Sequence, residues 1–198
     1  MQEITLLSNV SDAQADQAFT VFVESFYDMM RKTINKDKQT LHALFKESFD
    51  RSQVYVCLQD SRPVGFLAYA IAGKQSVVAN KNVFRKHLGL WGLGVAWGIG
   101  YFQPKAKDEN HAIIEYLAVC PSARGQGVGG KLIARLCETG GYRTYTLETT
   151  EENTSAVKLY TRLGFVKLPK KLSVLVRGFA CARGLGTPIY MKLDLDLR

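Results

Sequence analysis

The fold is decided by the stretch Ala112-Ile-Ile-Glu-Tyr-Leu-Ala-Val-Cys-Pro-Ser-Ala-Arg-Gly-Gln-Gly-Val-Gly-Gly-Lys-Leu132. Its first part predicts a buried β-strand over Ala112–Val119, and the apolar spacing after the glycines predicts an amphipathic helix over Val128–Glu138. A strand, a glycine loop and a helix in this order favour phosphate binding, because several backbone N–H groups point at one spot and the helix dipole adds partial positive charge. Glycine lets a bulky anion approach the backbone, since no Cβ stands in the way.

Two nucleotide-binding loops compete for this stretch. Gly125–Lys131 fits the first part of the mononucleotide pattern G-x-x-x-x-G-K-[ST], but Leu132 follows and has no hydroxyl for Mg²⁺. The glycines at positions 125, 127 and 130 also fit the dinucleotide pattern G-x-G-x-x-G, and Glu148 stands near the expected distance for the acidic partner. The strand of that pattern usually opens its fold, whereas here much of the chain precedes it.

A third interpretation rests on two motifs in one order. Arg124-Gly-Gln-Gly-Val-Gly129, preceded by Val119-Cys-Pro121, resembles the acyl-CoA loop [QR]-x-x-G-x-[GA] of the GNAT superfamily of N-acyltransferases. Asn153-Thr-Ser-Ala-Val-Lys-Leu-Tyr-Thr-Arg-Leu-Gly-Phe165 resembles that family's signature N-x-x-A-x-x-L-Y-x-x-x-G-F. The resemblance is specific over Ile113–Phe165, generic from Val54 onward, and weak before that.

The resemblance implies a fold and an activity. We expect an α+β fold with three layers, in which a mixed, mostly antiparallel central sheet is flanked by helices and a central β-α-β unit holds acyl-CoA. The chain is expected to form a single N-acetyltransferase domain over residues 1–198. Such a protein transfers an acetyl group from acetyl-CoA, its co-substrate, to a primary amine by direct attack in a ternary complex, and no metal is implied.

The two motifs also imply a binding site. By resemblance, the strand before the loop presents free backbone groups to the pantetheine arm, and the N–H groups of the loop hold the pyrophosphate. The implied cofactor-binding residues are Leu117, Ala118, Val119, Arg124, Gly125, Gln126, Gly127, Val128, Gly129, Gly130, Asn153, Ala156 and Tyr160. Asn153 is also suited to cap the helix that follows it.

Two residues are the candidates for catalysis. By resemblance, the phenol of Tyr160 is the general acid that gives a proton or hydrogen bond to the departing thiolate. Strand alternation predicts that Glu115 lies on one face with Ile113, Leu117 and Val119, where a carboxylate is costly unless it is paired or functional. Glu115 is therefore our candidate general base, acting directly or through water, and Glu148 is the second candidate.

Composition bounds the remaining functions. The chain has 198 residues, 46% hydrophobic and 22% charged, which is ordinary for a globular domain. The net charge of +8 suits an anionic ligand, but no dense basic and aromatic patch indicates nucleic acid. The 4 cysteines lack metal or disulfide spacing, and no leader-like or spanning segment is seen, so we expect a cytoplasmic protein with no membrane span.

The acceptor is not encoded in either motif. A small-molecule amine is the default, a peptide amine is the alternative, and a homodimer is one option, since dimers are common in the family. A non-catalytic acyl-CoA-binding regulator stays open as an alternative function. Trp91, Trp97, Tyr101 and Phe102 suggest either an acceptor pocket wall or a core role.

Outside the central stretch, periodicity predicts the other elements. We expect strands over Glu3–Leu7, Val54–Leu58, Val64–Ala72 and Thr144–Thr149, helices from Ser11, over Lys38–Phe49 and from Asn153 to Leu163, and a final strand pair over Val166–Val176 and Pro188–Leu195. The segment Asn80–Gly100 is apolar with helical leanings, but its glycines leave its structure ambiguous.

Overall fold

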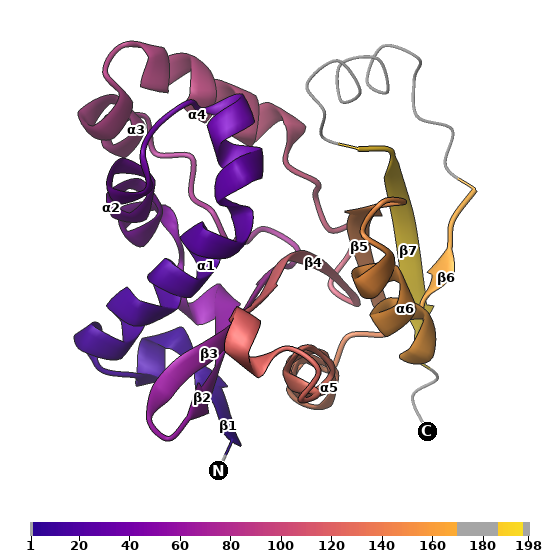
Figure 1. Ribbon diagram of the computed structural model, residues 1–198. Helices are drawn as coiled ribbons and strands as arrows, with labels where there is room; N and C mark the ends of the chain where they lie inside the picture. Colours follow the sequence, from indigo (N-terminus) through magenta and orange to yellow (C-terminus); the bar gives the residue numbers. More distant parts are fainter. Residues whose placement is uncertain (1, 170–185, 196–198) are drawn as a thin grey trace.

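A seven-stranded sheet forms the centre of the computed structural model, which describes residues 2–169 and 186–195 (Figure 1). The strands are β1 (Gln2–Leu6), β2 (Val54–Gln59), β3 (Arg62–Ala70), β4 (His111–Val119), β5 (Thr144–Thr150), β6 (Val166–Lys167) and β7 (Pro188–Asp194). They lie in the order β1-β2-β3-β4-β5-β7-β6. Only β4 and β5 pair in parallel, and the other neighbours are antiparallel. The mixed, mostly antiparallel sheet expected from the sequence is confirmed.

One face of the sheet is covered by α1 (Asp12–Thr33) and α2 (Lys38–Ser48). Helix α1 begins with a capping box, in which the Ser11 hydroxyl accepts from the Gln14 N–H and the Gln14 side chain accepts from the Ser11 N–H. The aromatic stripe of α1 then packs on the sheet, where Phe22 lies 5.1 Å from Phe66 of β3 between ring centroids. These buried aromatic side chains form the core on that face.

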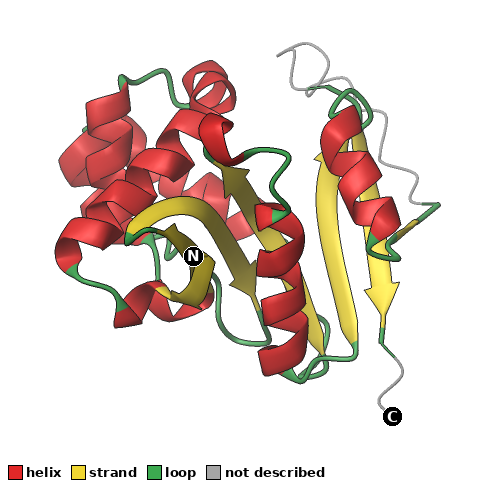
Figure 2. Ribbon diagram, turned by 60° about the horizontal axis from the view of Figure 1, so that its bottom comes forward, coloured by secondary structure: helices red, strands yellow, loops and turns green. Residues whose placement is uncertain are grey.

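The other face is covered by α5 (Val128–Gly140), and α6 (Thr154–Arg162) follows β5 (Figure 2). Val128, Leu132, Ile133 and Leu136 of α5 are buried against β2, β3 and β4, as the spacing predicts. Tyr160 of α6 belongs to the same buried cluster. Helices, sheet and helices therefore make three layers, and the expected fold class is confirmed.

The ambiguous apolar segment forms two helices, α3 (Lys81–Leu88) and α4 (Trp91–Phe102). They pack together where Gly92 meets the backbone of Phe84, and a Cβ at position 92 would lie 2.1 Å from the Phe84 carbonyl oxygen. The strand expected over Val166–Val176 pairs with β7 through Val166 and Lys167, and its residues 170–176 lie outside the described residues. No helix in the described ranges is long and apolar enough to cross a bilayer.

Candidate active site

The centre of the sheet opens between β4 and β5. These strands pair from His111 opposite Thr144 to Ile114 opposite Leu147, and no further pairing between them is found within residues 2–169. Strand β4 stays paired with β3 as far as Val119, whereas β5 stays paired with β7 as far as Thr150. The structure therefore places Leu117, Ala118 and Val119 on a length of β4 whose β5 side has no described strand partner, so their backbone groups there can pair with a ligand.

A β-bulge at Glu115 marks the start of this opening. Ala68 of β3 lies opposite Tyr116, but Tyr69 lies opposite Ile114, so Glu115 is the extra residue. The bulge shifts the alternation of β4, and Leu117 and Val119 pack in the same cluster as Ile114. The prediction that Ile113 shares a face with Leu117 and Val119 is wrong, because alternation holds only while every residue of the strand is paired.

The Glu115 carboxylate is held at both oxygens. Oε2 accepts from the Ser76 backbone N–H at 3.0 Å and from the Ser76 hydroxyl, and Oε1 accepts from Gln103 Nε2 at 3.0 Å. Burial raises the pKa of Glu115 above its ordinary value, and the bonds from Ser76 and Gln103 oppose that rise. Sequence reasoning missed both partners, because they lie in a loop and just after α4, where no motif marks them.

The glycine loop delivers backbone N–H groups to the mouth of the opening. A 3₁₀ turn over Pro121–Ala123 leads into Gly125 and Gly127, whose φ angles of 78° and 79° are left-handed and favour glycine. Gly127 precedes α5, and no side chain among the described residues caps this helix. The first N–H groups of α5 have no partner within the helix, so they are available to an anion.

The side chains of Arg124 and Gln126 shape the loop. Arg124 Nε donates to the Val119 carbonyl at 3.2 Å, and Gln126 Nε2 donates to the Ser122 carbonyl at 2.9 Å. The first bond ties the loop to the end of β4, and the second ties Gln126 to the 3₁₀ turn within the loop. Gly129, the last residue of the motif, and Gly130 follow Val128 in the first turn of α5.

The second motif lies on α6, beside the opening. Asn153 Oδ1 accepts from the Ala156 N–H at 3.3 Å, so Asn153 caps the helix as expected. Tyr160 is buried against Phe165, and burial raises the pKa of its phenol to about 12. Among the described residues its hydroxyl has no hydrogen-bond partner. A neutral, unpaired phenol can give its hydrogen bond to a ligand.

A comparison with known proteins agrees with this geometry. A sequence model of the Acetyltransferase (GNAT) family matches residues 19–165, most of the chain. The chain belongs to the GNAT family of acetyltransferases. The family uses acetyl-CoA, and the open β4 edge and the uncapped α5 N-terminus fit its pantetheine arm and pyrophosphate. In residues 2–169 and 186–195, no three His, Cys, Asp or Glu side chains gather as a metal site.

Comparison with individual relatives supports the fold but does not identify the acceptor. The spore coat polysaccharide biosynthesis protein SpsD of Bacillus subtilis is 37% identical over 70 residues, which are 34% of this chain and 24% of that protein. A Corynebacterium glutamicum structure described as histone acetyltransferase HPA2 and related acetyltransferase is 22% identical, with a TM-score of 0.66 over 100% of this chain and 98% of that one. An N-acetyltransferase from Staphylococcus aureus is 15% identical, with a TM-score of 0.60 over 98% and 100% of the two chains.

The second base candidate lies across the opening in this GNAT protein. Glu148 is exposed on β5, one residue beyond Leu147, the last residue that pairs with β4. It faces Tyr190 of β7, and burial together with the Glu148 carboxylate raises the pKa of Tyr190 to about 12. Glu148 is therefore engaged with β7, whereas Glu115 contacts Ser76, which precedes α3, and Gln103, which follows α4.

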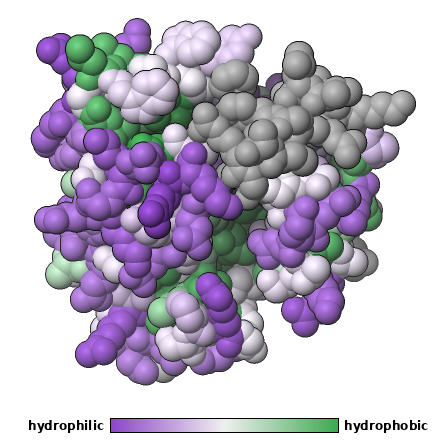
Figure 3. All heavy atoms as spheres, turned by 45° about the horizontal axis from the view of Figure 1, so that its top comes forward, coloured by the Kyte–Doolittle hydropathy of each residue, from purple (hydrophilic) through white to green (hydrophobic). Residues whose placement is uncertain are grey.

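The aromatic residues of α4 are not core residues. Trp91, Trp97 and Tyr101 are 65%, 62% and 68% exposed, and the Trp97 and Tyr101 rings stack with centroids 5.3 Å apart. Apolar side chains reach the surface on the side that α3 and α4 occupy (Figure 3). The core role considered for these three residues is wrong, because Gly92 and the buried Ala96 of α4, rather than its aromatic rings, pack against α3. The side chain of Phe102 lies outside the described part.

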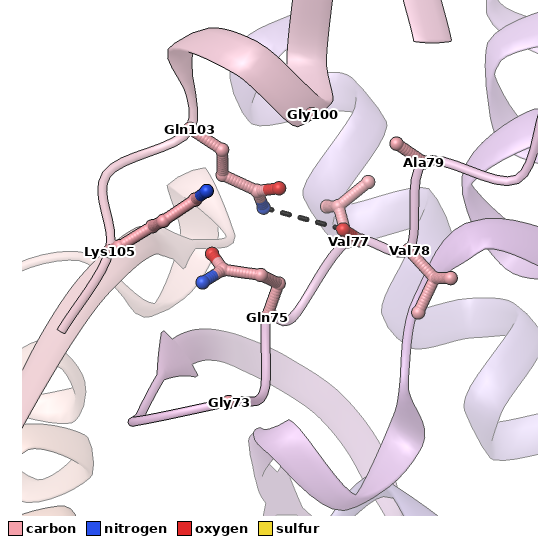
Figure 4. Close-up of a pocket in the computed structure, with 8 residues that line it drawn as sticks. All are labelled: Gly73, Gln75, Val77, Val78, Ala79, Gly100, Gln103 and Lys105. Carbon is pink, nitrogen blue, oxygen red and sulfur yellow. Dashed lines mark hydrogen bonds between the residues drawn. The ribbon is translucent and has the colours of Figure 1, made fainter. Parts of the chain in front are cut away.

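A pocket of about 290 Å³ lies beside the Glu115 network (Figure 4). Its walls come from the loop between β3 and α3 and from the end of α4. Gln75, Gln103 and Lys105 supply its polar groups, and Val77 and Val78 supply apolar surface. Gln103 Nε2 donates to both the Val77 carbonyl, at 3.4 Å, and Glu115 Oε1, so the pocket and the carboxylate share one side chain.

Proposed function

We propose that this GNAT protein transfers an acetyl group from acetyl-CoA to a small-molecule primary amine by direct attack in a ternary complex. The observation that carries the proposal is the opening between β4 and β5. It has free β4 backbone on one edge, uncapped N–H groups of α5 at its mouth, and Glu115 and Tyr160 beside it. Acetyl-CoA supplies a thioester whose carbonyl carbon is open to attack.

Glu115 and Tyr160 serve opposite ends of the transfer. Ser76 and Gln103 hold Glu115 toward the α4 side, whereas Tyr160 packs in the cluster beneath α5. We assign Glu115, directly or through one water, to remove a proton from the attacking amine. The amine nitrogen bonds to the carbonyl carbon, and the carbon–sulfur bond breaks.

Tyr160 then stabilises the leaving thiolate. With a pKa of about 12, its phenol is a much weaker acid than a thiol with an ordinary pKa of about 8.5, so complete proton transfer to sulfur is uphill. A hydrogen bond from the hydroxyl to sulfur is the favoured form of general acid assistance, and the thiolate takes its proton as it is released to water. One proton leaves the amine and one joins the thiol, so the reaction balances.

Thermal melting tests ligand choice first. The protein is melted alone, with acetyl-CoA, and with ATP–Mg²⁺ or NAD. A ligand at 100 times its dissociation constant adds about 2.7 kcal/mol of stability. We expect a rise with acetyl-CoA alone, followed by amine-dependent thiol release. Stabilisation without turnover on any amine would instead support a non-catalytic acyl-CoA-binding regulator, and a response to a nucleotide alone would contradict the proposal.

A further inference from the structure

The pocket beside Glu115 contains hydrogen-bond acceptors that the protein does not satisfy. Gln75 Oε1 is buried and has no hydrogen-bond partner among the described residues. Gln103 uses its Nε2 on Val77 and Glu115, so its own carbonyl oxygen is left as an acceptor. A buried acceptor without a donor destabilises the empty pocket, and a ligand with N–H groups removes that cost.

The same pocket carries one cation at its rim. The Lys105 side chain reaches toward Gln75 and Gln103 from the segment after α4 (Figure 4). No carboxylate within residues 2–169 or 186–195 pairs with it. Its neighbour in the loop, Lys107, is also exposed but does not line the pocket. Lys105 therefore favours an anionic group on whatever enters.

Size limits the ligand. The pocket volume of about 290 Å³ lies just under the range of about 300–1,000 Å³ that is usual for ligand pockets. Val77, Val78 and Ala79 give this volume an apolar side that suits a short alkyl chain. A small aliphatic molecule fits these dimensions better than a folded protein segment.

We propose that this pocket binds the acceptor substrate, and that the acceptor is a short aliphatic primary amine carrying an anionic group, whose ammonium meets the carbonyl oxygens of Gln75 and Gln103 and whose anion meets Lys105. The inference rests on the proposed function and names its substrate class. The ammonium gives its first proton to solvent and becomes the free amine that attacks, and because Gln103 also binds Glu115, this amine is held near the carboxylate that takes the second proton. The anion is a carboxylate or a phosphate, which share this chemistry.

The test compares amines of equal length and different charge. Initial rates with acetyl-CoA are measured for 4-aminobutyrate, n-butylamine and 1,4-diaminobutane, and 3-aminopropyl phosphate is compared with 4-aminobutyrate to separate phosphate from carboxylate. The wild-type protein should show the lowest KM for an anionic amine. Equal KM values for all three matched four-carbon amines would overturn the proposal.

Charge reversal sharpens the comparison. Lys105→Glu should change the ratio of KM values for 4-aminobutyrate and 1,4-diaminobutane by about tenfold or more in favour of the diamine. The new carboxylate repels the carboxylate of 4-aminobutyrate, which loses its exposed ion pair, and it forms an ion pair with the second ammonium of the diamine. Lys107→Glu makes the same change in net charge outside the pocket and should leave the ratio unaltered. If both variants move the ratio equally, the pocket is not the acceptor site.

A second variant addresses the amide. Gln75→Leu keeps the volume but removes the buried acceptor, so KM should rise for every amine while the melting temperature holds or rises. Binding of 4-aminobutyrate to the complex with CoA, measured by calorimetry, needs no turnover. If 4-aminobutyrate binds, Lys105→Glu abolishes that binding and no acetyl transfer occurs, the proposed binding site is supported and the proposed enzymatic function is rejected. If acetyl transfer occurs without a preference for anionic amines, the enzymatic function is supported and the proposed site is rejected.

Discussion

Glu115 Oε1 accepts a hydrogen bond of 3.0 Å from Nε2 of Gln103, and this bond joins the bulge of β4 to the residue that ends α4. The bond places a carboxylate of raised pKa next to a segment that lies outside both GNAT motifs. The proposed base is therefore connected to the segment that lines the neighbouring pocket. A substitution at Gln103 is therefore expected to alter both the pocket and the environment of Glu115.

Replacing the proposed base tests its role. Glu115→Gln should lower kcat by about 10²–10⁴, the contribution of general base catalysis, while acetyl-CoA still raises the melting temperature. The raised pKa of Glu115 also means that the wild-type protein is stabilised below that pKa and loses this stability as the pH rises through it. The variant should lack that component in a pH series of melting temperatures. A kcat within twofold of wild type would move the role to Glu148 or water.

Ser76→Ala tests how Glu115 is tuned. The variant removes a hydroxyl that donates to Oε2 but keeps the backbone donor. Because this bond lowers the Glu115 pKa against the effect of burial, its loss should raise that pKa further. The acidic limb of the kcat/KM profile should then shift to higher pH with the plateau largely kept. An unmoved limb would show that another group sets it.

The Tyr160 hydroxyl is tested by Tyr160→Phe. The substitution keeps the packing against Phe165, and the hydroxyl has no partner among the described residues, so unfolding free energy should change by less than about 1 kcal/mol. The value of kcat should fall by about 10²–10³, with acetyl-CoA affinity kept. Since the pKa is about 12, the wild-type rate should show no alkaline loss from this phenol below pH of about 10. Equal kcat in both proteins would exclude a role at the thiolate.

The sequence could predict the elements that local pattern and motif control. The N-cap at Ser11 and the apolar stripe that follows it predict α1. The apolar pattern of β4 and the glycines after it predict β4, the loop and α5, and each predicted element lies within a few residues of its observed bounds. The bulge at Glu115 was missed because it depends on how β3 pairs, which one strand's pattern does not contain. Ser76 and Gln103 were missed for a related reason, since side chains that meet only through tertiary folding have no spacing rule.

The apolar segment before β4 also could not be assigned from its sequence pattern alone. Its composition alone allowed a buried or a surface helix, and burial was decided by contact between Gly92 and Phe84, which exposes Trp97 and Tyr101. The assigned cofactor residues stay predictions, as do the single domain over 1–198, the cytoplasmic location and the homodimer. The structure places the residues of both motifs beside the opening, and a substitution at Gly127 tests whether the loop binds acetyl-CoA.

The loop itself is tested by a matched pair of glycines. Gly127 and Gly141 lie before and after α5, with φ of 79° and 67°, and a Cβ at either position would meet nothing within 4 Å. Gly127→Ala and Gly141→Ala should therefore each cost about 1–2 kcal/mol of stability, because only the left-handed backbone opposes the new side chain. Chemical denaturation measures this cost.

Only one of the two substitutions should affect the ligand. Gly127 precedes the uncapped N–H groups of α5, so a shift of its backbone there should weaken acetyl-CoA binding by about tenfold, measured by calorimetry well below the melting temperature. Gly141 ends the helix far along the chain from those groups, and Gly141→Ala should bind acetyl-CoA as the wild type does. Equal loss of affinity in both variants would mean that general destabilisation, rather than the loop's geometry, controls binding, and the anion site at α5 would have to be abandoned.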